Sequence, residues 1–140
     1  LFHTFEHFPD PLNKLRQIMR HLKKGGRVII EVPHAGDFLL RDDVACEAFR
    51  RHTLWSQHLI LHTRTSLTAM LKHAGFNGVT IQGVQRYPLS NHLYWLANGK
   101  PGGHVSTLSA IDSSNLLTCY QASLARLDAT DTIIAVATKK

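Results

Sequence analysis

The sequence predicts a single α/β domain in which three strands form a sheet flanked by helices. Segments with apolar residues at helical spacing alternate along the chain with short runs of β-branched residues. Glycine follows the first two expected helices at the point where each should end. The chain has 140 residues, of which 44% are hydrophobic and 19% charged, so it is long enough for one domain with a core.

The first helix is expected to begin at Pro11, because Asp10 can cap it and proline is tolerated at the first helical position. Its apolar stripe comprises Leu12, Leu15, Ile18, Met19 and Leu22. The segment KKGG ends the helix with cations in its last turn and glycine beyond it. RVIIEV follows at once, and its continuous apolar character predicts a buried strand at residues 27–32.

Residues 33–62 show no clear periodicity and are expected to be irregular or briefly helical. Thr65 or Ser66 is expected to cap a second helix, which ends at Gly75. The segment GVTIQGVQRY then predicts a second strand, at residues 79–87.

A turn-rich segment with a short helix at residues 89–97 leads to a third helix, which begins at Asp112 or Ser113. The buried stripe of this helix is expected to comprise Leu117, Tyr120, Leu124 and Leu127. DTIIAVATKK predicts a last strand at residues 132–138. Sheets usually have about five or six strands, so three look like one half of a larger doubly wound fold.

Composition narrows the classes of function. The sequence contains no apolar run of about 20 residues and no signal peptide, so we expect a cytoplasmic protein that does not enter the membrane. Two cysteines, Cys46 and Cys119, lie far apart and are expected to be reduced thiols. The net charge of +6 suits a phosphate-bearing partner. Nucleic acid is not expected, because no aromatic residues alternate with the basic residues in a stacking stripe.

The segment FHTFEHFPDPLNKLRQIMRHLKKGGRVIIEVP resembles the second half of a class I S-adenosylmethionine-dependent methyltransferase. In that family the fourth strand runs into an H-x-x-E-H loop, a helix begins D-P and ends L-K-P-G-G, and the fifth strand ends E-x-P. Lys24 stands where the family usually has proline. TRTSLTAMLKHAGF and DTIIAVATKK resemble the segment before the sixth strand and the seventh strand. The resemblance implies a partial Rossmann-like fold whose mixed sheet has the order 27–32, 132–138, 79–87.

This sequence differs from the family mainly at the cofactor site. The family holds S-adenosylmethionine with a glycine-rich turn after its first strand and an acidic residue that ends its second, and neither motif is present in this sequence. The segment GKPGG, at residues 99–103, is rich in glycine but follows no predicted strand. The resemblance therefore implies that this chain is a truncated, carboxyl-terminal portion of a methyltransferase. We expect the chain not to bind S-adenosylmethionine tightly and to be inactive by itself.

The resemblance also implies a set of site residues. His3, Glu6 and His7 would lie beside the cofactor, and Glu31 and His34 would face the methyl acceptor, because ligands of open α/β sheets gather at the carboxyl ends of strands. The alternative is structural: a polar chain end for the first three residues and a strand end stopped by proline for the last two.

The segment LWSQH resembles the Y-D-E-H motif of sugar C-methyltransferases, which implies a sugar or another small molecule as acceptor. Trp55, Ser56 and Gln57 replace the tyrosine, aspartate and glutamate, and only His58 is retained. His58 is the candidate general base, since a neutral imidazole can take a proton from the acceptor. The lost acidic neighbours leave no local carboxylate to orient it, so a histidine on an amphipathic segment is the alternative.

Trp55, Tyr87 and Asn91 are further candidates for contacts with the acceptor, although an aromatic core or interface patch would have the same composition. His58 and His62 are spaced as on one helix face, but no cysteine or carboxylate lies at a suitable local spacing to complete a metal site. We therefore expect no metal.

A non-enzymatic binding or interaction module is the alternative function, using the basic face or an exposed sheet edge. In the fold that the resemblance implies, the strand at residues 27–32 would be bare along one edge. An apolar unpaired edge is a template for another chain. We therefore expect a homodimer paired through residues 28–32.

Overall fold

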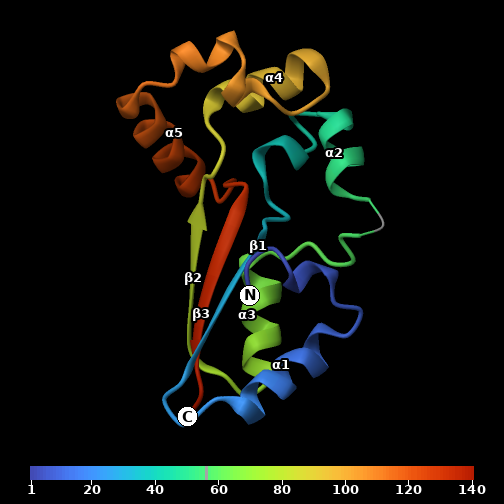
Figure 1. Cartoon of the computed structure of the whole chain (residues 1–140), viewed down its shortest axis with the longest axis vertical. Coiled ribbons are helices and arrows are strands. Elements are labelled where there is room, and N and C mark those ends of the chain that lie inside the picture. The colour runs from blue at the N-terminus through green and yellow to red at the C-terminus, as the bar shows by residue number, and fades with distance from the viewer. Residues whose placement is uncertain (56) are drawn as a thin grey trace. The chain divides into compact units, whose positions relative to one another are not determined.

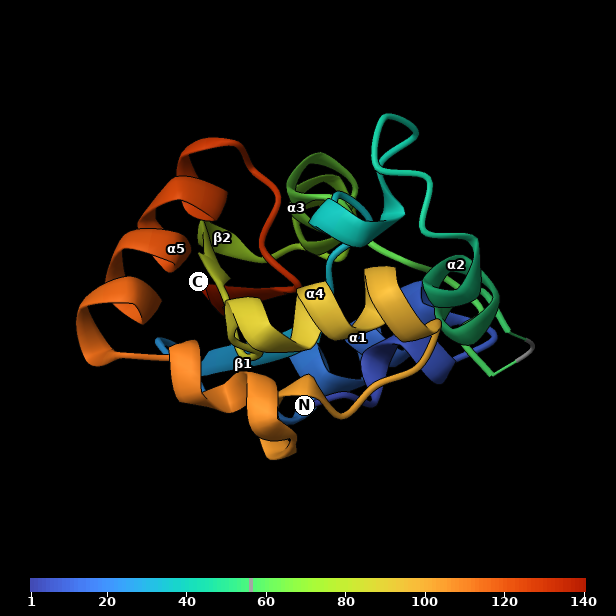
Figure 2. The ribbon, with the colours of Figure 1, turned by 90° about the horizontal axis from the view of Figure 1, so that it is seen from above.

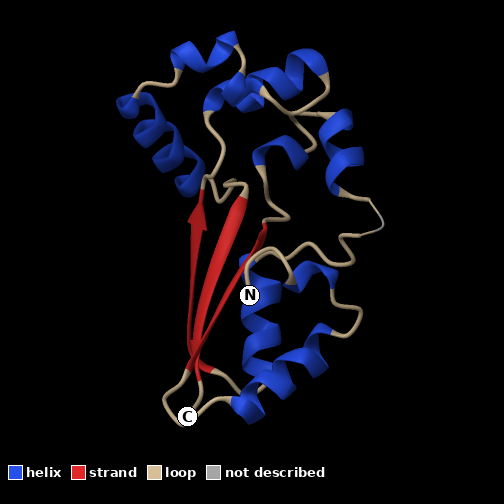
Figure 3. Cartoon of the chain, viewed as in Figure 1, coloured by secondary structure: helices blue, strands red, loops and turns tan. Residues whose placement is uncertain are grey.

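The structure is a computed structural model that describes residues 1–55 and 57–140. These residues form two compact units. The sheet unit comprises residues 1–35, 57–82 and 132–140, and the helical unit comprises residues 36–55 and 83–131. The three strands, red in Figure 3, belong almost entirely to the sheet unit.

Three strands form one sheet in the order β1 (Arg27–Pro33), β3 (Thr132–Thr138), β2 (Asn77–Val84). The central strand β3 runs antiparallel to β1, with Arg27 opposite Thr138. Figure 1 shows that β2 also runs opposite to β3, so β1 and β2 point the same way. The α/β class and the strand order expected from the sequence are confirmed.

The core of the sheet unit lies between the sheet and two helices, α1 (Pro11–His21) and α3 (Arg64–His73), on one face (Figure 1). Alternate strand residues and the apolar stripes of both helices meet there: Val28, Ile30, Val32, Ile133, Ala135, Ala137, Leu15, Leu67 and Leu71. On the opposite face Ile29 remains 45% exposed. The strict alternation in β1 follows from the two-residue period of a strand.

Helix α1 begins at Pro11 as predicted. The Asp10 side chain caps it by accepting a hydrogen bond from the backbone N–H three residues on, at 3.0 Å. At the other end, Lys139 Nζ donates to the carbonyl oxygens of Met19 and Leu22, at 2.7 and 2.8 Å. The lysine tail thus satisfies carbonyl groups that the helix end leaves without a partner.

Helix α3 begins earlier than predicted. Thr63, not Thr65 or Ser66, is the cap, because its hydroxyl accepts a hydrogen bond from the Ser66 backbone N–H at 3.1 Å. The Ser66 hydroxyl in turn accepts one from the Thr63 N–H at 2.9 Å. This reciprocal pair is a capping box in which serine takes the place usually held by glutamate.

The edge of β1 is partly occupied. The Glu31 N–H donates to the Leu1 carbonyl at 2.8 Å, and the His3 N–H donates to the Glu31 carbonyl at 2.9 Å. Phe2 and Glu31 thereby form a parallel bridge. The edge is therefore not fully bare, whereas the sequence predicted a bare one, and the homodimer through residues 28–32 stays a prediction.

The helical unit contains α2 (Glu47–Thr53), α4 (Leu89–Asn98), α5 (Ser114–Arg126) and three 3₁₀ turns at Phe38–Leu40, Gly103–Val105 and Thr107–Ile111. Figure 2 shows the last two turns alongside α4, and both contact it. Leu39, Cys46 and Trp95 form a small core. Among the residues that the structure describes, no helix has the length and apolar character needed to cross a membrane.

Two expectations from the sequence need correction, one about the end of β2 and one about the buried face of α5. Strand β2 ends at Val84 rather than Tyr87, because the Asp131 carboxylate accepts hydrogen bonds from the N–H groups of Arg86 and Tyr87, at 2.9 and 3.0 Å. Of the buried stripe predicted for α5, only Leu124 is fully buried. Leu117 is 39% exposed, and Leu127, just after the helix, is 56% exposed.

Candidate functional site

A group of polar side chains gathers in the sheet unit, where residues 1–3 run parallel to the end of β1. His3 Nε2 lies 3.0 Å from a carboxylate oxygen of Glu31, so the two sequence-predicted residues interact directly. Both lie at the carboxyl ends of parallel segments, the position at which open α/β sheets bind ligands. His34 also lies there but is buried, and it forms a bridge with His62.

Glu6 points inward from a 3₁₀ turn at Phe5–His7, and its side chain is only 1% exposed. The Glu6 backbone carbonyl accepts hydrogen bonds from the N–H groups of Leu59 and Ile60, at 3.0 and 3.3 Å. These bonds tie the first residues of the chain to a segment more than fifty positions away.

His7 and His58 meet beside Glu6. The two imidazole rings lie 5.2 Å apart, and His7 Nδ1 is 2.6 Å from the Gln57 carbonyl oxygen. One ligand atom each of Glu6, His7 and His58 lies within 4.8 Å of the others. We call these three residues the Glu6–His7–His58 cluster. Ser56 of the LWSQH motif lies outside the described residues.

His58 and His62 do not share a helix face, because residues 58–62 are not helical. His62 is fully buried, stacks on Phe5 with ring centroids 5.4 Å apart, and has its pKa lowered by burial. His52 belongs to the other unit and contacts Trp95. The partners of His58 come instead from the start of the chain, and local spacing carries no signal for that contact.

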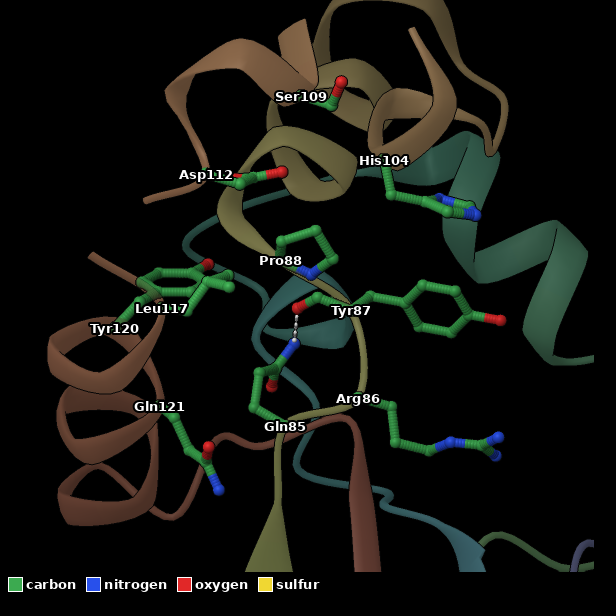
Figure 4. Close-up of a pocket in the computed structure, with 10 residues that line it drawn as sticks. All are labelled: Gln85, Arg86, Tyr87, Pro88, His104, Ser109, Asp112, Leu117, Tyr120 and Gln121. Atoms are coloured by element: carbon green, nitrogen blue, oxygen red, sulfur yellow. Dashed lines mark hydrogen bonds between the residues drawn. The ribbon is translucent and has the colours of Figure 1, made fainter. Parts of the chain in front are cut away.

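The helical unit contains a separate cavity of about 390 Å³. Figure 4 shows its lining, with three residues of α5 facing the segment that follows β2: Gln85, Arg86, Tyr87, Pro88, His104, Ser109, Asp112, Leu117, Tyr120 and Gln121. Tyr87 was expected to contact the acceptor and lines this cavity. Asn91 does not; its buried amide oxygen accepts a hydrogen bond from the Gly102 N–H at 3.2 Å, which is a structural role. Trp55 belongs to the same unit and is 49% exposed.

Asp37 and His92 are buried polar groups of the helical unit whose proton affinities move in opposite directions. Burial raises the pKa of Asp37 to about 7, although the hydrogen bond from the Leu39 N–H, at 2.7 Å, lowers it. Burial lowers the pKa of His92 to about 4, and His92 Nδ1 lies 2.5 Å from the Tyr120 hydroxyl. Burial also raises the pKa of Tyr120, so this tyrosine stays protonated.

These shifts predict how replacements change the pH dependence of stability. From pH 4 to 7 the folded state retains a proton on Asp37 that the unfolded chain releases near 3.8, so this residue lowers the free energy of unfolding as pH rises. His92 does the reverse between pH 4 and 6.5, because the unfolded chain binds the proton that the folded state excludes. Each group changes the number of bound protons by about one, so each changes the free energy of unfolding by about 1.4 kcal/mol per pH unit. The two contributions have opposite signs and offset one another.

Relative to wild type, Asp37→Asn is therefore expected to make the free energy of unfolding rise more steeply with pH between 4 and 6.5. His92→Gln is expected to make it fall across the same window. Urea unfolding followed by tryptophan fluorescence measures both, since Trp55 and Trp95 lie in the helical unit. Two variants with the pH profile of wild type would show that neither group titrates differently in the folded state.

The glycine-rich segment at residues 99–103 does not form a cradle for a cofactor. Gly99 ends α4 with φ +64, and a Cβ atom on Gly103 would lie 2.1 Å from the Ser90 carbonyl oxygen. These glycines end a helix and allow close packing of the chain on itself. This segment therefore does not take the place of the glycine-rich turn that holds S-adenosylmethionine in the family.

Comparison with known proteins identifies the family. The sequence profile of the family described as "Methyltransferase domain" matches residues 1–81. Two similar solved structures are S-adenosylmethionine (SAM)-dependent methyltransferases from Archaeoglobus fulgidus and Thermotoga maritima, which are 15% and 16% identical to this chain, with TM-scores of 0.58 and 0.56. They align with 99% and 98% of this chain.

The chain spans only part of each relative, 57% of the Archaeoglobus protein and 52% of the Thermotoga protein. No curated protein matches the sequence significantly. The family match covers more than half of the chain, and the strand order is the one that the resemblance implied. This chain belongs to the methyltransferase domain family and is a portion of a class I S-adenosylmethionine-dependent methyltransferase fold.

Proposed function

We propose that this chain provides the acceptor side of an S-adenosylmethionine-dependent methyltransferase that acts on a small polar molecule, with sugars as the expected class. One observation carries the proposal: His58 lies beside Glu6 and His7, about fifty positions away in the sequence. Glu6 in turn lies 3.8 Å from His3, which contacts Glu31 where two parallel segments end. In open α/β sheets, ligands gather at such ends.

His58 is proposed to take the proton that an acceptor hydroxyl or carbon loses during transfer. An imidazole suits this step, because its ordinary pKa lies near neutral pH. The sequence motif lacks its own carboxylates, and the Glu6 carboxylate, from another part of the chain, lies within 4.8 Å of a His58 ring nitrogen. Glu31 and His3 form a second carboxylate–imidazole pair beside it, 3.0 Å apart, which can hold acceptor hydroxyl groups.

The helical unit has a cavity of its own, which by itself suits a small polar molecule. A volume of about 390 Å³ lies within the usual range for small-molecule sites. Gln85, Arg86 and Asp112 are among its lining residues. Amide and carboxylate groups bind hydroxyls, and a guanidinium also binds phosphates. Tyr87 adds an aromatic surface, on which a sugar ring can stack.

A transfer assay with two proteins tests the proposal. The first is the chain itself, which we expect to bind no S-adenosylmethionine at micromolar concentrations in isothermal titration. The second is a chimaera that adds the amino-terminal half of the Archaeoglobus enzyme, which we expect to bind the cofactor and to methylate sugars in a panel that also holds amines and phenols. A chimaera that binds the cofactor but methylates no member of the panel would contradict the proposed function.

A further inference from the structure

We infer that the Glu6–His7–His58 cluster binds a divalent transition-metal ion of the zinc class. The inference goes beyond the proposed methyl transfer and does not depend on it. The three side chains offer one carboxylate oxygen and two imidazole nitrogens, all within 4.8 Å of one another. Three protein ligands of this kind, with a fourth position open, form a common zinc-binding set.

Among the described residues, the buried Glu6 carboxylate lacks the partner that a bound cation would provide. Its side chain is 1% exposed, and no described residue donates a hydrogen bond to either carboxylate oxygen. Imidazole nitrogens of His3 and His7 lie 3.8 Å from Glu6 Oε1, beyond hydrogen-bonding distance. A buried carboxylate without partners lowers stability, and a bound cation would offset that cost.

His7 is already oriented as a ligand. A backbone carbonyl can only accept a hydrogen bond, so the short contact of 2.6 Å to the Gln57 oxygen places the proton of His7 on Nδ1. Nε2 then keeps its lone pair, and it is this atom that lies 3.8 Å from Glu6 Oε1. Histidines that bind metals usually donate their other N–H to a carbonyl or a carboxylate in this way.

The backbone holds the ligands near their final separation. The hydrogen bonds from Leu59 and Ile60 to the Glu6 carbonyl keep the segment of His58 against the turn that carries Glu6 and His7. Ligands at about 2.0–2.1 Å around tetrahedral zinc lie about 3.3 Å apart, so side-chain shifts of about 1 Å complete the site.

The chemistry of the ligands selects the ion. Imidazole with carboxylate suits Zn²⁺, Co²⁺ and Ni²⁺, whereas Mg²⁺ and Ca²⁺ prefer sites made of oxygen alone. A cation would occupy the lone pair of His58 that a general base needs. Loading the site is therefore expected to inhibit any transfer that depends on this histidine.

The test measures metal binding by the whole chain, prepared without an affinity tag and treated with a chelator. Isothermal titration with Zn²⁺ and the visible absorption of Co²⁺ are expected to show one saturable site, which Mg²⁺ does not fill. Glu6→Gln and His58→Ala are each expected to weaken binding at least about tenfold. His73→Ala is the matched control, because His73 is an exposed histidine of the same unit and should leave binding unchanged.

Thermal unfolding adds a readout that separates a ligand from a merely structural residue. Without metal, Glu6→Gln is expected to unfold at a higher temperature than wild type, since it removes a buried charge. With Zn²⁺, only the wild-type chain and the His73 control are expected to gain stability. Absence of a saturable Zn²⁺ site in wild type, or equal affinity of wild type and both ligand variants, would overturn the inference whatever the transfer assay shows.

Discussion

Replacing His58 by alanine in the chimaeric methyltransferase is expected to lower turnover by about 10²–10⁴-fold, the usual effect of losing a general base. The affinity for S-adenosylmethionine should stay nearly unchanged, because His58 is proposed to act on the acceptor. The assay is run with a chelator present, so that no cation occupies the imidazole. Initial rates at saturating acceptor and isothermal titration with the cofactor separate the two quantities.

The structure offers a matched control for this variant. His73→Ala removes an exposed imidazole from α3 of the same unit, and it is expected to keep the turnover of the parent. Equal turnover of the His58 and His73 variants would assign His58 to the structural alternative. If turnover and cofactor affinity fall together in the His58 variant, the imidazole instead supports the fold around the Glu6–His7–His58 cluster.

Replacing Gly103 by alanine is expected to destabilise the helical unit by about 3–5 kcal/mol. A Cβ atom at this buried position would lie 2.1 Å from the Ser90 carbonyl oxygen and 2.7 Å from Asn91 Cα. Both are backbone atoms in the first turn of α4, so they cannot swing aside as a flexible side chain could. The 3₁₀ turn at Gly103–Val105 would have to move away from the helix on which it packs.

Urea unfolding followed by tryptophan fluorescence reports on this unit, because both tryptophans belong to it. Val105→Ala is the matched control in the same 3₁₀ turn. Its side chain is 79% exposed, and the variant should unfold within about 0.5 kcal/mol of wild type. A Gly103 variant as stable as this control would show that the turn does not lie against α4 as the structure describes.

The sequence alone was enough to predict those features that depend on residues close together in the chain, such as helix starts and strands. Asp10 and Pro11 place the start of α1, because a capping carboxylate and a proline at the first position act within one turn. The three runs of β-branched residues predict the three strands, and the resemblance to methyltransferases supplied their order. The same resemblance singled out His3, Glu6, His7 and His58 as site residues.

Only the tertiary structure decided what those residues contact. Glu6 and His58 are separated by more than fifty positions, so no helical or strand period relates them, and their meeting depends on backbone hydrogen bonds from residues 59 and 60 to the Glu6 carbonyl. The end of β2 depends in the same way on Asp131, which is distant in sequence. Its carboxylate accepts hydrogen bonds from two N–H groups that would otherwise pair with β3 in a longer strand. Sequence spacing predicts contacts one turn or one strand residue away, whereas a buried carboxylate gains its neighbours from the packing of distant segments.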